Sequence, residues 1–148
     1  MIYLGADHGG FQLKKFLTTY LTKTLKKEVE DLGAHASEPT DDYPDFAFAV
    51  ARKVADSNEK DIGILLCRSG LGMAIAANKV KGIRAIVGNS ILAAELGRKH
   101  NHANVLSLDA DQLSHEHAMA IVKTFLETPY DMDPRHVRRV EKIMDYEK

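Results

Sequence analysis

Apolar residues along the chain fall into short continuous runs separated by segments of helical spacing. The short runs predict strands at 2–5, 29–33, 63–66, 83–87 and 105–108. Helical spacing and capping residues predict helices at about 11–26, 44–54, 73–77, 90–99, 114–127 and 135–146. Strands that alternate with helices form right-handed βαβ units, and such units build a parallel sheet. The pattern therefore predicts an α/β fold with a five-stranded parallel sheet, helices on both faces and an extra C-terminal helix.

The chain has 148 residues and shows no internal repeat, linker or low-complexity segment that would divide it. We expect one domain over 1–148, long enough to bury a core. The formal net charge is −1, so charge gives no reason to expect nucleic acid or an anionic membrane as a partner. The first residues lack the basic and apolar regions of a secretory leader, and no apolar stretch reaches membrane-spanning length. With one cysteine there is no internal disulfide, which suits a reducing cytoplasm.

The chemistry of the chain centres on its only cysteine, Cys67, at the end of the most apolar run. A Ser/Gly-rich turn follows, and an Ala-rich helix begins after Gly72. Free N–H groups and the helix dipole favour an anion at such a helix start, so a thiolate there would be stabilised. The alternative is a small buried cysteine that only ends a core strand. An arginine six positions after the cysteine would indicate a phosphatase loop, but Met73 stands there.

Asp7 and His8 follow the first predicted strand and precede two glycines. The glycines do not have the G-x-G-x-x-G spacing of a dinucleotide site, although Asp31 stands about where a ribose-binding acid would. A carboxylate and an imidazole suit a hydroxyl-rich ligand such as a sugar, while Asp7 would equally serve as a cap for the next helix. The carboxyl ends of parallel strands share one edge of the sheet, so we expect this pair beside Cys67.

Other histidines and arginines give weaker signals. Two pairs of histidines are two residues apart, at 100 and 102 and at 115 and 117, and this spacing does not favour a metal site. His100 stands in the predicted turn at 100–104, just before the fifth strand, and function tends to collect at such loops. In the last helix Arg135 and Arg139 are four residues apart and share a face, which describes either a solvated surface or a site for a phosphate monoester.

Taken together, these segments resemble type B ribose-5-phosphate isomerase, in a family that includes galactose-6-phosphate isomerase subunits. The resemblance rests on Gly5 to Gly10, Asp42 to Asp45, Cys67 to Lys79, His100-Asn101 with Asn104, and Arg135-His136 with Arg139. It covers nearly the whole chain in collinear order. It implies a Rossmann-like three-layer sandwich that needs no metal or cofactor. It also implies homodimers or homotetramers with shared active sites, in which the helix at 134–148 packs on a partner subunit.

The resemblance also implies roles in proton transfer. Cys67 matches the base that moves a proton between C1 and C2 of the sugar. Ser69 and the backbone amides of Gly70, Leu71 and Gly72 match the loop that holds the enediolate oxygens. Aldose–ketose isomerisation needs one base and preorganised donors for a developing oxyanion, and this turn would supply both.

Three further residues match groups that handle the sugar ring. His100 matches the residue that opens the furanose, with Asp7 assisting, and Asp42 matches a carboxylate assigned as an acid.

The remaining matches concern the phosphate and the hydroxyls. His8, Arg135 and Arg139 match phosphate contacts, and Asn101 matches a contact to a sugar hydroxyl.

Two positions depart from the family pattern. Arg68 stands where the family usually has glycine, and Asp111 stands where it usually has a phosphate-contacting arginine. We expect Arg68 to face the pocket and either pair with Asp111 or take over part of the anion binding; the alternative is a side chain that points away.

The sequence therefore predicts a cytoplasmic isomerase of a sugar phosphate that converts ribose 5-phosphate to ribulose 5-phosphate. The alternatives are another aldose phosphate, of allose, galactose or a tetrose, or a non-catalytic module that binds a sugar or nucleotide.

Overall fold

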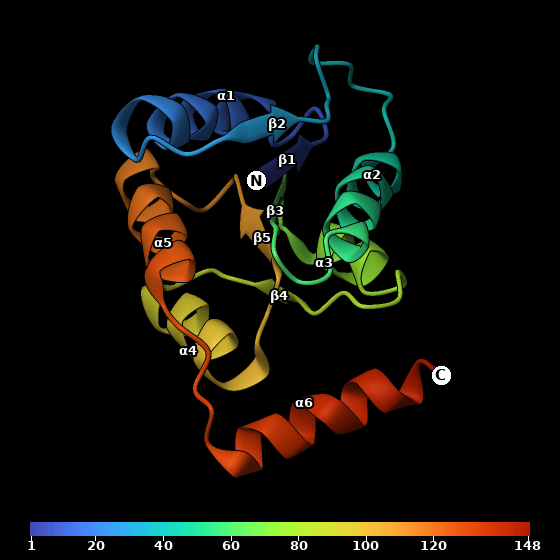
Figure 1. Cartoon of the computed structure of the whole chain (residues 1–148). Helices are drawn as coiled ribbons and strands as arrows, with labels where there is room; N and C mark the ends of the chain where they lie inside the picture. The colour runs from blue at the N-terminus through green and yellow to red at the C-terminus, as the bar shows by residue number, and fades with distance from the viewer.

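The computed structural model describes residues 1–148 and contains one five-stranded parallel sheet (Figure 1). The strand order is β2-β1-β3-β5-β4, and every neighbouring pair is parallel. The strands are β1 (Ile2–Ala6), β2 (Val29–Asp31), β3 (Ile62–Cys67), β4 (Ala85–Val87) and β5 (Val105–Asp109). β3 lies in the middle and is the most deeply buried, which its uninterrupted apolar run requires. The predicted parallel sheet is confirmed.

Helices cover both faces of this sheet and give the predicted three layers. The helices are α1 (Phe11–Thr19), α2 (Tyr43–Asp56), α3 (Leu71–Ala77), α4 (Ile91–Asn101), α5 (His115–Glu127) and α6 (Pro134–Tyr146), and a π-helix, η1 (Tyr20–Thr24), extends α1. α1, α4 and α5 enclose one core cluster of 17 buried residues, and α2 and α3 enclose a second of 11. No helix is both long and apolar enough to cross a membrane.

Two helices end differently from the prediction. The first continues as a π-helix, where the Thr18 and Thr22 hydroxyls donate to carbonyls one turn back. The fourth was predicted to end at Lys99, but it runs on to Asn101. His102 ends it in the left-handed conformation, with φ of 49°. His100 and Asn101 therefore belong to the helix and not to a turn.

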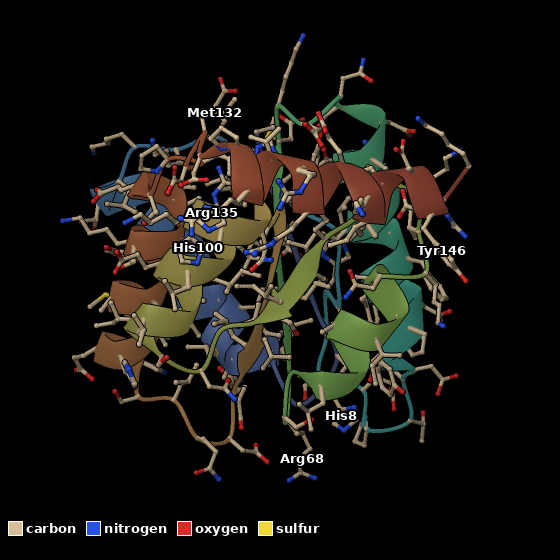
Figure 2. All side chains as sticks on the ribbon, turned by 90° about the horizontal axis from the view of Figure 1, so that it is seen from below. His8, Arg68, His100, Met132, Arg135 and Tyr146 are labelled. Carbon is tan, nitrogen blue, oxygen red and sulfur yellow. The ribbon has the colours of Figure 1, made fainter.

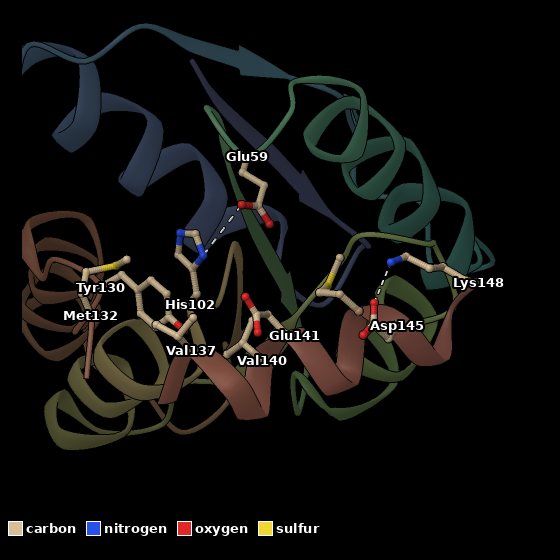
Figure 3. A pocket seen from close by; sticks show the side chains of 10 residues that line it. Glu59, His102, Tyr130, Met132, Val137, Val140, Glu141, Asp145 and Lys148 are labelled. Carbon is tan, nitrogen blue, oxygen red and sulfur yellow. Dashed lines mark hydrogen bonds and ion pairs between the residues drawn. The ribbon is translucent and has the colours of Figure 1, made fainter. Parts of the chain in front are cut away.

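α6 lies across the edge of the sheet where the strands begin (Figure 1). The Gly82 amide donates to the Glu147 carboxylate at 2.8 Å. The buried Arg84 guanidinium contacts Glu59 at 2.8 Å and the Met144 sulfur at 2.9 Å. A cavity of about 590 Å³ opens beside α6, lined among others by His102 and Tyr130 (Figure 3). These contacts hold α6 on its own chain at the amino edge of the sheet.

Candidate active site

The candidate site lies where the strand order reverses. The chain leaves β1 towards β2 on one side, whereas β3 pairs with β1 on the other. Ligands of open α/β sheets bind outside the carboxyl ends of the strands at such a switch point. Asp7 and His8 follow β1 and Cys67 ends β3, so the topology brings these predicted residues to one edge, as expected. Asp7 is buried, and its Oδ1 accepts the amides of Gly9 at 2.9 Å and Gly10 at 3.2 Å.

Cys67 is held by the turn that follows it. Its side chain is buried, and its sulfur accepts the Gly70 amide at 3.1 Å. Gly70 has φ of 76°, and a Cβ there would meet the Leu108 carbonyl carbon at 2.9 Å, so the position requires glycine. The Ser107 hydroxyl fixes the turn from β5 by donating to the Gly70 carbonyl at 2.6 Å. The Gly70 amide and the glycine turn therefore fix the position of the sulfur at the end of β3.

The first turn of α3 supplies donors beside this sulfur. The first amides of an α-helix have no acceptor within the helix, so they can turn to an acceptor outside it. In this structure the Leu71 amide donates to the Ser69 hydroxyl at 3.2 Å, and Ser69 is exposed at the mouth of the turn. The ring of Tyr43 covers Gly72 closely: a Cβ on this glycine would lie 2.6 Å from Tyr43 Cζ. Tyr43 therefore forms one wall of the turn.

His8 has a carboxylate partner that the sequence did not reveal. Its Nδ1 lies 2.6 Å from Oδ1 of Asp41, and the same oxygen accepts the His8 amide at 3.2 Å. This hydrogen bond is the main cause that raises the pKa of His8, with help from the charge of Asp7; partial burial and the charge of Arg68 act against it. A raised pKa favours the imidazolium, which suits contact with an anion.

Arg68 lies on the same edge as His8 (Figure 2). Its Cγ packs over Gly9, and its Nε is 3.4 Å from Oδ2 of Asp111. The predicted pairing is therefore observed. Both side chains are largely exposed, at 72% and 51%, and an exposed pair contributes only about 0–1 kcal/mol. Little free energy is needed to release Arg68 towards another anion.

Four predicted site residues lie elsewhere, at the opposite edge of the sheet. His100 and Asn101 end α4 before β5 begins, and Arg135 and Arg139 lie on α6. Figure 2 shows His100 and Arg135 well apart from His8 and Arg68. A strand rises about 3.3 Å per residue, so the strands separate the two edges by roughly 15–20 Å. Within one chain these four residues do not meet Cys67.

Asp42 and Asp41 lie side by side but have different surroundings. Asp42 is exposed at the N-cap position of α2, and its side chain makes no capping hydrogen bond. Asp41 is the residue that contacts His8. Nothing local distinguishes the two aspartates in sequence, because the path of the loop at 34–42 decides which of them reaches His8.

Two clusters bring together side chains of the types that bind metals. Asp7, His8 and Asp41 form one, and His100, Asp131 and His136 form the other, each with potential ligand atoms within 4.8 Å of one another. In the first, hydrogen bonds between the members already engage Asp41 and His8. In the second, the rings of His100 and His136 are tilted by 31° with centroids 4.1 Å apart.

Comparison with known proteins identifies the family of the chain. Residues 2–143 match the Ribose/Galactose Isomerase family. The chain belongs to this family. A probable ribose-5-phosphate isomerase B of Mycoplasma genitalium is 44% identical over 147 residues, which cover 99% of this chain and 95% of that protein. Ribose-5-phosphate isomerase B of Mycobacterium tuberculosis is 40% identical over 148 residues, which cover 99% and 90%.

Solved structures of the family show the same fold. The crystal structure of ribose-5-phosphate isomerase B from Mycoplasma genitalium with bound ribulose-5-phosphate superimposes with a TM-score of 0.94, at 44% identity, over 99% of this chain and 95% of that one. The isomerase B structure from Clostridium thermocellum gives a TM-score of 0.93 at 44% identity, over 99% and 96%. The family and the Rossmann-like fold implied by the sequence are thus confirmed.

Proposed function

We propose that the chain is an aldose–ketose isomerase that interconverts ribose 5-phosphate and ribulose 5-phosphate. The observation that carries the proposal is the sulfur of Cys67 with the Gly70 amide at 3.1 Å, placed at the switch point of the sheet. The Mycoplasma genitalium relative with bound ribulose-5-phosphate has this fold and 44% identity, which supports the same substrate here.

The reaction moves one carbon-bound proton and one hydroxyl proton. The furanose opens when a proton leaves the anomeric hydroxyl and another reaches the ring oxygen, a task suited to His100 with Asp7. The Cys67 thiolate then removes the proton from C2, and the C1 carbonyl becomes an enediolate oxygen. The amides of Leu71 and Gly72 and the Ser69 hydroxyl stabilise this oxygen, and the Gly70 amide joins them once the sulfur has taken up the proton. The thiol returns the proton to C1, while the O2 proton passes to O1. Asp42 remains the proposed acid for that exchange.

A second copy of the chain completes this proposed site. His100 and Asn101 would come from the partner, together with the phosphate contacts Arg135 and Arg139, because these residues lie at the other edge of their own chain. None of the three cavities in the single chain includes Cys67, which fits a site that a partner encloses.

Exposed apolar side chains support such an assembly. Leu71 and Ile75 on α3 are 56% and 64% exposed beside the catalytic turn, and Ile143 on α6 is 49% exposed. Burial of such side chains drives association. A second apolar group on α4 would allow a tetramer, formed by Ile91, Leu92 and Leu96. A thiol that acts as a base must stay reduced, so we place the protein in the cytoplasm.

A panel of C4 to C6 aldose phosphates tests the substrate. Each compound is assayed for ketose formation by the purified protein, with the Cys67→Ala variant as the blank. We expect the highest kcat/KM for ribose 5-phosphate. A higher value for allose 6-phosphate, galactose 6-phosphate or a tetrose phosphate would contradict this assignment, and binding without turnover would contradict the enzymatic role.

A further inference from the structure

A second histidine lies against His100 at the junction of α4 and α6. His136 is in the first turn of α6, and its ring packs against His100 at a tilt of 31°, with centroids 4.1 Å apart. The side chain of His136 is only 13% exposed. His100 is near the end of α4, and His136 is the aromatic ring that packs against it.

Asp131 holds His136 in turn. Oδ2 of Asp131 lies 3.5 Å from Nδ1 of His136, a buried nitrogen with no hydrogen bond in the single chain. Asp131 is itself fixed by its backbone, because its amide donates to the Lys99 carbonyl at 2.9 Å. Its other oxygen accepts the Asp133 amide at 2.8 Å. The backbone of Asp131 is therefore bound to Lys99, next to His100, and its carboxylate is bound to the start of α6.

We propose that Asp131 and His136 are positioning residues for the ring-opening step. The carboxylate of Asp131 faces Nδ1 of His136 at 3.5 Å and favours the ring orientation that keeps this nitrogen towards it. The ring of His136 then restricts His100 to one orientation, with a nitrogen presented to the sugar that the partner binds. The inference rests on the proposed role of His100. Asp131 and His136 are the two residues that hold His100 in a single orientation.

Ring opening depends on the orientation of His100, whereas the later proton transfer between carbon atoms does not. Proton transfer to a ring oxygen depends on alignment, and a misplacement of about 1 Å can cost 10²-fold in rate. The later transfer between C2 and C1 belongs to Cys67, whose turn is fixed separately by Gly70 and Ser107. Loss of His136 or Asp131 should thus impair ring opening and leave carbon–hydrogen chemistry intact.

Ribulose 5-phosphate separates the two steps. Its O5 carries the phosphate, so the ketose cannot close a furanose ring and reaches the site in open form. Exchange of its C1 proton with deuterium oxide, followed by NMR, reports on Cys67 chemistry and phosphate binding. Turnover of ribose 5-phosphate, which is mostly cyclic, requires ring opening as well.

We expect His136→Ala and Asp131→Ala to lower kcat for ribose 5-phosphate by about 10- to 100-fold. We expect C1 exchange in ribulose 5-phosphate to stay within about 2-fold, which also shows that the assembled site has folded. His136→Phe keeps an aromatic ring against His100 but loses the Asp131 contact, so it should recover only part of the ribose 5-phosphate activity. His117→Ala removes an exposed histidine of α5 and should change neither reaction.

His100→Asn serves as the reference for the proposed function itself. If it slows both reactions equally, the role of His100 in ring opening is wrong. If it slows only ribose 5-phosphate turnover while His136→Ala and Asp131→Ala have no selective effect, the positioning role is wrong and the function stands. Equal losses in His136→Phe and His136→Ala would also contradict it, because the aromatic contact with His100 would then not matter. Dialysis against EDTA should leave both rates unchanged; a selective loss would assign the three residues to a metal ion instead.

Discussion

Nδ1 of His8 and Oδ1 of Asp41 lie 2.6 Å apart, and that oxygen also accepts the His8 amide at 3.2 Å. Because the backbone amide of His8 also binds the Asp41 carboxylate, that carboxylate is held in place independently of the His8 imidazole. The pair raises the pKa of His8, mainly through the hydrogen bond, and thereby extends the pH range in which His8 is a cation. Any stabilisation from the raised pKa is complete below pH 6.5 and is lost as the pH rises through the higher value.

Asp41→Asn should weaken binding of sugar phosphate above neutral pH. The amide removes the charged hydrogen bond that raises the pKa of His8, so at pH 8 less of the imidazolium is present and KM for ribose 5-phosphate should rise. At pH 6 the imidazole is largely protonated with either residue, and the increase should be smaller. An NMR titration should show the pKa of His8 falling towards 6.5. Glu38→Gln, in the same loop, is the matched control; an unchanged pKa of His8 in Asp41→Asn would contradict the assignment.

Cys67→Ala should abolish proton transfer and preserve the fold. Loss of a general base costs at least ~10²-fold in kcat, whereas the methyl group still fills the buried site at the end of β3. Measurement of kcat and of thermal unfolding separates the two effects. Cys67→Ser should be almost as inactive, because a hydroxyl does not ionise near neutral pH. A near wild-type rate in Cys67→Ala would mean that another group is the base.

The residues at the switch point of the sheet could be predicted from the sequence because they directly follow strands that local periodicity identifies. Periodicity placed β1 and β3, and the rule that parallel strands end at one edge brought Asp7 and His8 to Cys67. The pairing of His8 with Asp41 depends on a loop 33 residues away, and the contact of His100 with His136 joins two helices. Neither has a local signal. The order of β5 and β4 in the sheet likewise depends on long-range packing and could not be read from periodicity.

Active sites shared between subunits predict recovery of activity in mixed dimers. Cys67→Ala chains have intact arginines, and Arg135→Ala/Arg139→Ala chains have an intact Cys67. Because the two sites of a symmetric dimer are equivalent, an equal mixture should form one intact site in each heterodimer and regain roughly a quarter of wild-type activity. Native mass spectrometry confirms subunit exchange. If exchanged dimers remain inactive, each site lies within one chain.

Arg68 is the residue most suited to alter phosphate binding in this chain. It lies beside His8, its Nε is 3.4 Å from Asp111, and both partners are largely exposed. Such a pair contributes about 0–1 kcal/mol, so a phosphate can draw the guanidinium away from Asp111.

Arg68→Gly should therefore raise KM for ribose 5-phosphate by about 10-fold, since one charged hydrogen bond contributes about 1.5 kcal/mol. Any activity on free ribose should stay nearly unchanged, because that sugar carries no anion for Arg68. Asp111→Asn should act in the opposite direction and lower KM, because it releases the arginine from its competitor. Arg68→Lys keeps the charge without the planar fork and should fall between wild type and Arg68→Gly. Steady-state kinetics on both sugars test this, and an unaltered KM in Arg68→Gly would show that Arg68 is a neutral surface residue.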